Sequence, residues 1–236
     1  MLLHRIVSLL RRSTGLLPCS IRLHALTALD VALRAAEPEN IFVPPVVAQK
    51  RCGCAVDVGA NNGVTTCIMA RHFDQVLAFE ANPRLAGELK KCAPANVKVE
   101  GVALSSSAGQ ATLTVPVSAG VTLEGWGSME APLAQNFEGL RQLTVETRTL
   151  DSFQLPRLDY LKIDVEGHEM AVLHGARETL ARCHPWLAVE AMGDQQERVR
   201  EFLKALGYQE SSLQALCSRV GTAHNLVFIP PPITPS

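Results

Sequence analysis

The stretch from Cys54 to Gly63, Cys-Ala-Val-Asp-Val-Gly-Ala-Asn-Asn-Gly, constrains the fold of this chain more than any other segment. Its apolar start is typical of a short buried strand. Its glycines predict a sharp turn, after which residues 65–73 are predicted to form a helix. A strand, a turn and a helix in this order open a doubly wound α/β fold. Such a helix also presents free backbone N–H groups at its N-terminus to a polar or anionic part of a ligand.

The next predicted strand, 76–79, ends at an acidic residue, Glu80. An acid about 20 positions after the turn is where such folds hold the hydroxyls of a ribose. A dinucleotide site needs a glycine in the middle of G-x-G-x-x-G so that the backbone can approach a pyrophosphate, and here Asn61 stands in that place. S-adenosylmethionine (SAM) has a ribose but no pyrophosphate, so the spacing favours SAM over NAD. An α/β domain with a tight turn and no ligand is the alternative.

The rest of the chain continues the alternation of strands and helices. The pattern predicts an α/β fold, a Rossmann-like doubly wound and mostly parallel sheet with an antiparallel closing hairpin. The loop 117–141 is long for a compact domain, so we expect it to be a lid or a substrate wall. The other predicted elements are a helix at 84–92, a strand at 97–104, half-exposed antiparallel strands at 111–115 and 143–148, a strand from 158 with its exit at 167, a helix at 169–182, a strand at 185–190, a helix at 194–206, and the hairpin 208–210 with 225–229.

The sequence divides into an N-terminal helical segment with a linker, residues 1–49, and a single catalytic domain, residues 50–236. Apolar residues in 1–17 fall roughly on one helical face, and no acidic residue precedes Asp30. Three hypotheses compete for this helix: it packs on the domain or helps it dimerise, it makes peripheral contact with an anionic membrane, or it is a cleaved targeting peptide. A second helix is predicted at 24–36, and the linker at 41–49, which contains Pro44 and Pro45.

Composition excludes several classes of protein. The length of 236 residues with 47% hydrophobic residues suits one sizeable core, and no run approaches the roughly 18 apolar residues of a membrane span. A net charge of −1 and an aromatic content of 5% argue against a nucleic-acid partner. The seven cysteines are scattered without zinc-like spacing, so we expect reduced thiols in a cytoplasmic protein and no structural metal. The sequence does not specify an oligomeric state.

Candidate catalytic groups lie at the predicted strand ends: Asp164, Glu166, His168 and Glu190. Asp164, Glu166 and His168 are two apart and share a face as far as the chain stays extended, which Gly167 interrupts. Such a group can raise the pKa of one carboxyl and supply a general base, or it can hold a divalent cation. The simpler alternatives are that Glu166 favours the helix dipole, that His168 is a cap or a solvated side chain, and that Lys162 pairs with a neighbouring acid.

Several of these motifs together resemble the FkbM family of SAM-dependent methyltransferases. The similarity extends over about residues 50–230, and the Lys-Ile-Asp-Val-Glu-Gly block is its most specific part. The residues that carry the resemblance are Val56–Gly63 (VDVGANNG), Phe79–Pro83 (FEANP), Gly127–Met129 (GSM), Thr149–Asp151 (TLD) and Leu161–Glu169 (LKIDVEGHE), running on to Ala176.

The resemblance implies O-methylation of a hydroxyl on a sugar, glycan or secondary metabolite. It implies that SAM lies with its ribose at Glu80, its adenine near Val102 and Ala103, and its reacting methyl facing Asp164. The methionine end would be lined by Asp57, Gly59, Asn61 and Gly63. The alternatives are a SAM-binding scaffold without catalysis, used for interaction, and an NAD-dependent oxidoreductase, against which Asn61 argues.

Overall fold

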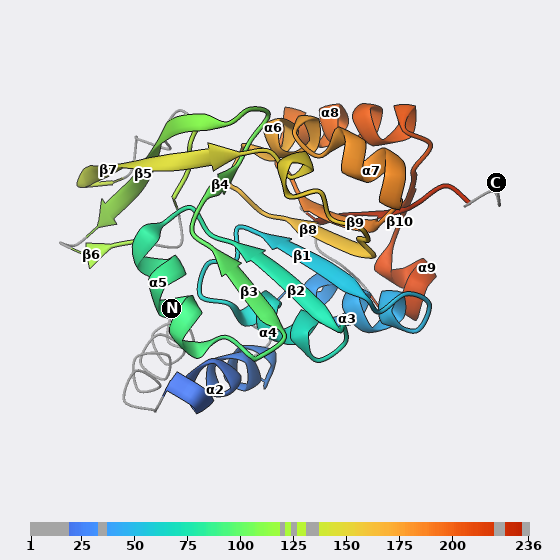
Figure 1. The fold of residues 1–236 in the computed structure, drawn as a ribbon, viewed down its shortest axis with the longest axis horizontal. Coiled ribbons are helices and arrows are strands. Elements are labelled where there is room, and N and C mark those ends of the chain that lie inside the picture. The colour runs from blue at the N-terminus through green and yellow to red at the C-terminus, as the bar shows by residue number, and fades with distance from the viewer. Residues whose placement is uncertain are drawn as a thin grey trace.

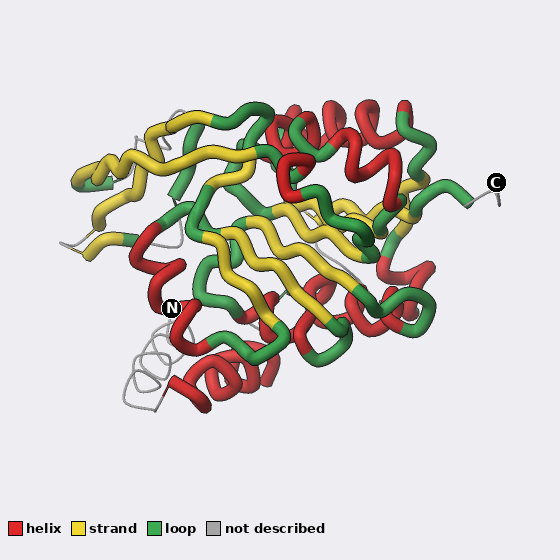
Figure 2. The backbone as a smooth tube through the Cα atoms, in the orientation of Figure 1, coloured by secondary structure: helices red, strands yellow, loops and turns green. Residues whose placement is uncertain are grey.

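The computed structural model describes residues 19–32, 37–118, 121–123, 127–130, 137–219 and 225–232. A seven-stranded sheet forms the middle layer, with helices on both of its faces (Figure 1). A four-stranded sheet extends from one end of this body, as the strand colouring of Figure 2 shows. The helix expected within residues 1–17 lies outside the described residues. No helix in the described ranges is both long and apolar enough to cross a membrane.

The main sheet confirms the predicted fold class. Its strand order is β10-β11-β9-β8-β1-β2-β3, and all neighbours are parallel except β11, which is antiparallel to both β9 and β10. Strand order therefore reverses between β1 and β8, which is where doubly wound folds bind ligands. The strands are β1 Cys54–Val58, β2 Gln75–Phe79, β3 Val97–Glu100, β8 Tyr160–Ile163, β9 Trp186–Glu190, β10 Gln209–Ser211 and β11 Asn225–Ile229.

The two faces of the sheet bury different helices because side chains alternate along each strand. Val56, Leu161 and Val189 face the core beneath α6, α7 and α8, whereas Ala55 and Tyr160 face α3, α4 and α9. A smaller cluster joins α2 and α5 to the β2–β3 end. The helices are α2 Cys19–Ala32, α3 Pro38–Ala48, α4 Val64–Ala70, α5 Pro83–Cys92, α6 Glu169–His174, α7 Arg177–Cys183, α8 Asp194–Ala205 and α9 Leu213–Cys217.

The linker predicted at 41–49 is wrong, because residues 41–48 lie within helix α3 and Gln49 is its C-cap. Pro44 and Pro45 lack the amide hydrogens that a helix interior uses, which is why the sequence suggested a break. Burial outweighs that loss: Val43 and Val47 are fully buried against Met69 and other core residues. The chain boundary at residue 50 stays a prediction, although α3 packs into the same core as the strands.

The single strand predicted at 97–104 is also wrong. The chain leaves the main sheet after β3, and β4 (Ala103–Leu104) pairs with β7 in the second sheet. The antiparallel pair is confirmed as β5 (Gly109–Ser118) with β7 (Gly139–Arg148). These strands run further than expected and, with β6 (Val121–Thr122), take up part of the predicted loop 117–141. Its segments 119–120, 124–126 and 131–136 lie outside the described residues.

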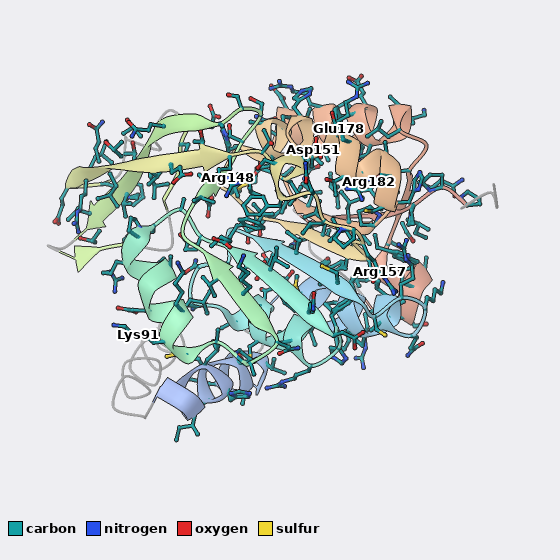
Figure 3. The ribbon with its side chains drawn as sticks, viewed as in Figure 1. Lys91, Arg148, Asp151, Arg157, Glu178 and Arg182 are labelled. Carbon is teal, nitrogen blue, oxygen red and sulfur yellow. The ribbon has the colours of Figure 1, made fainter. Side chains whose placement is uncertain are left out.

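The predicted helix 169–182 is two helices that meet at Gly175. A side chain at this position would collide with the carbonyl oxygen of Ser105, so the helix break brings α6 against the loop after β4. Asp151, from a different segment, caps the start of the second helix: its carboxylate accepts from the backbone N–H groups of Glu178 at 3.1 Å and Thr179 at 2.8 Å. Asp151 and Glu178 lie side by side at the start of α7 (Figure 3).

The turn after β1 is in direct contact with the exit of β8. Gly59 has φ +82°, and a Cβ there would collide with the carbonyl oxygen of Asp164. The Asp164 N–H donates to Val58 O at 3.0 Å, and the Gly59 N–H donates to Phe79 O at 2.9 Å. The left-handed backbone and the close approach both require glycine here. Gly59 thereby sets the distance between the two loops on either side of the switch point.

We expect Gly59→Ala to lower the free energy of unfolding by at least about 2 kcal/mol, through left-handed strain and the collision with Asp164. Gly87→Ala is the matched control, because Gly87 lies inside α5 with open space around the Cβ position. This control should gain roughly 0.5–1 kcal/mol. Urea unfolding followed by circular dichroism measures both, and equal stabilities for the two variants would contradict the role assigned to Gly59.

Candidate active site

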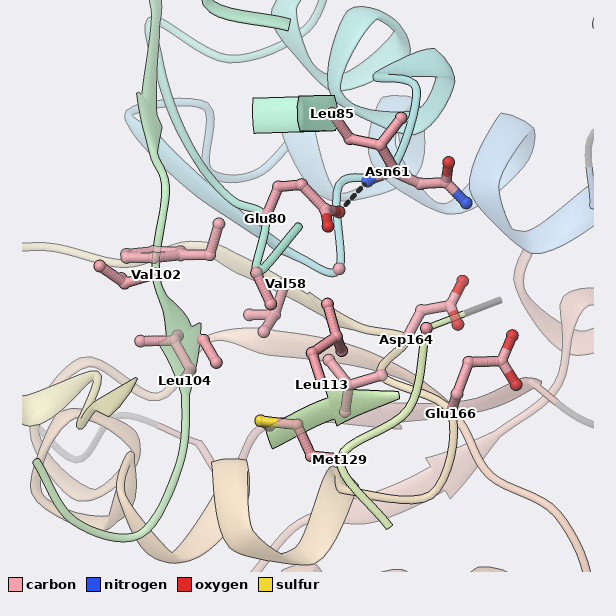
Figure 4. A pocket seen from close by; sticks show the side chains of 16 residues that line it. Val58, Asn61, Glu80, Leu85, Val102, Leu104, Leu113, Met129, Asp164 and Glu166 are labelled. Atoms are coloured by element: carbon pink, nitrogen blue, oxygen red, sulfur yellow. Dashed lines mark hydrogen bonds between the residues drawn. The ribbon is translucent and has the colours of Figure 1, made fainter. Parts of the chain in front are cut away.

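A pocket opens at the carboxyl ends of β1, β2 and β8, where strand order reverses. The pocket extends under the second sheet. Leu113 of that sheet and the nearby Gly127 and Met129 form part of the pocket wall. Figure 4 shows Asp164 and Glu166 on one side of the pocket and Val102 and Leu104 on the opposite side. The pocket thus has an acidic end and an apolar end.

Glu80 lies between these two ends and is only 7% exposed. Its Oε2 accepts from the Asn61 N–H at 2.6 Å (Figure 4), and its Oε1 accepts from the Asn82 N–H at 2.8 Å. Burial raises the pKa of Glu80 to about 6, and these two backbone N–H groups oppose the rise. Each oxygen of an ionised carboxylate accepts more than one hydrogen bond, so a backbone-anchored Glu80 is still able to hold a pair of ligand hydroxyls.

The residues predicted for the cofactor are divided between the pocket and the packing beneath it. Gly59 and Asn61 line the pocket. Asp57 is 2% exposed and accepts from the Thr66 hydroxyl at 2.5 Å, and burial raises its pKa to about 6. A Cβ at Gly63 would collide with the Leu89 side chain, so this glycine lets the start of α4 pack against α5. Asp57 and Gly63 therefore support the turn from below.

The apolar end holds the two residues expected near adenine, Val102 and Ala103. Both follow β3, at the point where the chain crosses to the second sheet. Leu104 and Phe79 extend the same apolar surface, and the Phe79 ring meets the Phe153 ring edge to face at 4.8 Å. Flat apolar ligand groups are favoured by such a wall.

A buried lysine, Lys162, pairs with acids at the strand ends next to the acidic end of the pocket, although neither Lys162 nor Glu190 is among the residues that line the pocket. Lys162 Nζ lies 3.2 Å from Asp164 Oδ2 and 3.8 Å from Glu190 Oε2, and its side chain is 1% exposed. Burial and the adjacent Asp164 raise the pKa of Glu190 to about 8. Burial alone would lower the pKa of Lys162, but the surrounding carboxylates outweigh it and raise this pKa. The structure thus brings Asp164 and Glu190 together around one ammonium.

Glu166 and His168 do not continue that group. The chain turns at Glu166, φ +51°, and Gly167, φ +101°, so the face shared by the extended chain ends before His168. Glu166 lines the pocket. His168 instead lies 2.7 Å from Glu130 Oε1 through Nδ1 and 3.0 Å from Ser105 Oγ through Nε2. Glu130 and Ser105 carried no local sequence signal, because only the fold brings them to His168.

A second hydrogen bond joins the same two loops. The Ser128 hydroxyl donates to the Glu166 carbonyl at 2.7 Å, and the Ser128 N–H donates to Thr114 O at 3.0 Å. The Gly-Ser-Met segment at 127–129 is thereby held against the exit of β8, with Met129 in the pocket wall. Two motifs that lie far apart in the sequence form one side of the pocket.

No group of three or more His, Cys, Asp or Glu residues that could hold a metal ion occurs in the described ranges. The divalent cation considered from the sequence therefore has no ligand set in this part of the chain. Asp164 and Glu190 are instead partnered by Lys162.

The open parallel sheet, its ligand pocket at the switch point and the anchored acid after β2 define a Rossmann-like protein of the methyltransferase type. Residues 57–210, more than half of the chain, match the family model described as the methyltransferase FkbM domain. The chain belongs to this family.

Similarity to individual proteins is more distant. The hexuronic acid methyltransferase AglP of Haloferax volcanii is 32% identical over 130 residues, which cover 52% of this chain. The chain spans about half of that protein's length (50%). An FkbM methyltransferase structure from Methylobacillus flagellatus KT has a TM-score of 0.49 and 15% identity, covering 89% of this chain and 54% of that chain. An rRNA methylase from Streptococcus thermophilus has a TM-score of 0.49 and 14% identity, with coverages of 80% and 94%.

We expect His168→Ala to release the 127–130 segment from the β8 exit, because both ring contacts are lost. Amide exchange at Ser128 and Glu130 should accelerate about tenfold, while global stability falls by only about 1 kcal/mol. Hydrogen exchange with mass spectrometry measures the first effect and urea unfolding the second. His72→Ala, at a half-buried histidine after α4, is the control. Unchanged exchange in the His168 variant would refute the role assigned to His168 in holding the 127–130 segment against the exit of β8.

Proposed function

We propose that this chain is a SAM-dependent methyltransferase that methylates a hydroxyl group of a sugar. The observation that carries the proposal is the pocket at the switch point, where the backbone-anchored Glu80 stands between an apolar wall and an acidic end. Membership of the FkbM family supports methyl transfer. The name of the Haloferax relative, a hexuronic acid methyltransferase, supports a sugar as the acceptor.

The pocket residues fit the parts of SAM. Glu80 would hold the ribose hydroxyls, and Val102 and Ala103 would contact the adenine. Gly59, Asn61 and Asp164 would line the methionine end. SAM carries positive charge on its sulfonium and its amino group, which suits the carboxylates at this end of the pocket. Each of these assignments can be tested by a substitution in the 236-residue chain.

When bound, SAM supplies a methyl group that is already activated by the positive sulfur. The main task of the chain is to orient the acceptor hydroxyl, which contributes roughly 7–11 kcal/mol in favourable cases. Met129 and Gly127, which line the pocket wall beside the Ser128–Glu166 hydrogen bond, would help to exclude water from this space once the ligands are bound. Either Asp164 or Glu190 would take the one hydroxyl proton that methyl transfer releases, with Lys162 holding the two carboxyls beside each other.

Calorimetry with SAM and with S-adenosylhomocysteine tests the cofactor assignment. We expect micromolar binding that weakens at least tenfold in Glu80→Gln, because the amide replaces one acceptor oxygen with a donor that faces backbone N–H groups. Glu88→Gln is the control, since Glu88 lies exposed on α5. Absence of binding to folded protein would overturn the proposal. Binding without methyl transfer to any hydroxylated acceptor would favour a non-catalytic scaffold.

The raised pKa of Glu190 makes a separate prediction that needs no acceptor. The pKa of this carboxyl is about 8 in the folded state and near 4.5 in the unfolded state, so its protonated form stabilises the fold fully at pH values below 4.5. This stability is lost as the pH rises through 8. The unfolding free energy of the wild type relative to Glu190→Gln should therefore fall between pH 4.5 and 8, by at most about 1.4 kcal/mol per pH unit. Urea unfolding at several pH values measures this difference. A difference that does not vary with pH would show that Glu190 ionises normally.

The same group predicts the pH profile of methyl transfer. Turnover should rise with pH and level off above about 8, because the base must lose its proton. Asp164→Asn removes the neighbouring carboxylate that helps raise the pKa of Glu190, so the inflection should move to lower pH, and turnover should fall more than SAM affinity does. Unchanged turnover in Asp164→Asn would remove Asp164 from the proposed mechanism.

A further inference from the structure

Helix α2 carries apolar residues on an outward face as well as on the face that packs against the domain. Leu23 is buried in the cluster that joins α2 to α5, together with Leu89. On another side of the helix, Ile21 is 50% exposed and Val31 is 36% exposed. Exposed positions recur there at spacings of three, four and three residues, which places them on one side of a helix. We call this side the α2 face, and it comprises Ile21, His24, Ala28 and Val31.

The α2 face is unusual for a helix at the surface of a domain. Such a helix normally buries one apolar stripe and presents polar or charged residues to water. Helix α2 buries Leu23 and nevertheless presents Ile21, Ala28 and Val31 on its exposed side. A helix that is apolar on both sides is favoured where both sides are removed from water. The α2 face is therefore expected to have a partner.

The surroundings of the α2 face are basic. Helix α5 packs beside α2, and its last turn exposes Lys90 and Lys91, the second of which is labelled in Figure 3. Glu88 lies in the groove between the two helices, but its carboxylate is paired with Arg84 at 2.8 Å. In the sequence no acidic residue precedes Asp30, whereas the same stretch contains four arginines: Arg5, Arg11, Arg12 and Arg22. This end of the protein thus combines apolar surface with positive charge.

We propose that the α2 face docks on an anionic lipid surface, with the lysines of α5 and the arginines ahead of Asp30 at the headgroups. Apolar side chains flanked by basic ones are typical of helices that lie in a membrane interface. The chain itself offers two other apolar partners, its own residues 1–17 and the α2 face of a second copy. Both would bring further positive charge next to Lys90 and Lys91, whereas anionic headgroups are complementary to them.

Vesicle flotation with the 236-residue chain tests the proposal. At low salt, vesicles of phosphatidylcholine with about one-quarter phosphatidylglycerol should bind the protein, and pure phosphatidylcholine should bind it about tenfold more weakly or less. High salt should weaken the binding, because it screens exposed charges. Lys91→Gln should weaken it about fivefold. The double variant Ile21→Ser, Val31→Ser should weaken it about tenfold, because less apolar area enters the interface.

Two matched controls should leave vesicle binding unchanged. Lys204→Gln replaces an exposed lysine on α8, and Leu140→Ser replaces an apolar residue on β7 that is 42% exposed. Circular dichroism checks that every variant is folded. Should the double variant fail to fold, the comparison of Lys91→Gln with Lys204→Gln still decides.

Three outcomes would overturn the inference. The first is no binding of the wild type to the anionic vesicles. The second is binding that the α2 and α5 variants leave unchanged, since the lipid contact would then lie elsewhere in the chain. The third is a dimer in sedimentation equilibrium without lipid that Ile21→Ser dissociates, which would assign the α2 face to a second copy. None of these outcomes involves SAM, so the inference and the proposed function can fail separately.

Discussion

The contact between the turn after β1 and the exit of β8 is the constraint on which the site depends. Gly59 lies against the carbonyl of Asp164 with no room for a side chain, and the neighbouring Val58 accepts from the Asp164 N–H. Both loops therefore leave the sheet at a set separation. The pocket occupies the space above that contact. The close approach of the two backbones, which is possible only because Gly59 has no side chain, therefore determines where a ligand can lie.

The second sheet turns this open edge into an enclosed site. The chain crosses to it immediately after Glu100, and the crossing itself supplies the apolar wall at Val102. The contacts of Ser128 and His168 then hold the far side of the wall to the β8 exit. These contacts are single hydrogen bonds made by loop residues. Breaking them costs less free energy than disrupting the packing of the core.

Ionisable groups at the site are buried only where a partner offsets desolvation. Glu80 is bonded by two backbone N–H groups, and Asp57 accepts from Thr66. Lys162 lies among acids, and Glu190 responds to burial and to Asp164 with a raised pKa. Burial raises the pKa values of Asp57 and Glu80 to about 6 and that of Glu190 to about 8, so these carboxyls exchange protons near neutral pH, as general-base chemistry requires.

Much of the fold was predictable from the sequence, because its signals are local. The strand–turn–helix at 54–70, the acid at Glu80 and the alternation in 143–148 each reflect the geometry of a few neighbouring residues. Local signals failed where packing outweighed them: buried valines hold α3 helical despite Pro44, and the 97–104 segment divides between two sheets.

Only the tertiary structure decided which residues share the site. His168 is separated from Asp164 by a turn, and it is placed beside Ser105 and Glu130. Ser128 and Glu166 are 38 residues apart in the chain, yet the Ser128 hydroxyl donates to the Glu166 carbonyl beside the pocket. The sequence by itself determined the strand ends and the acids that they carry. It did not determine how those ends meet, because that depends on core packing between segments far apart in the chain, which leaves no local pattern.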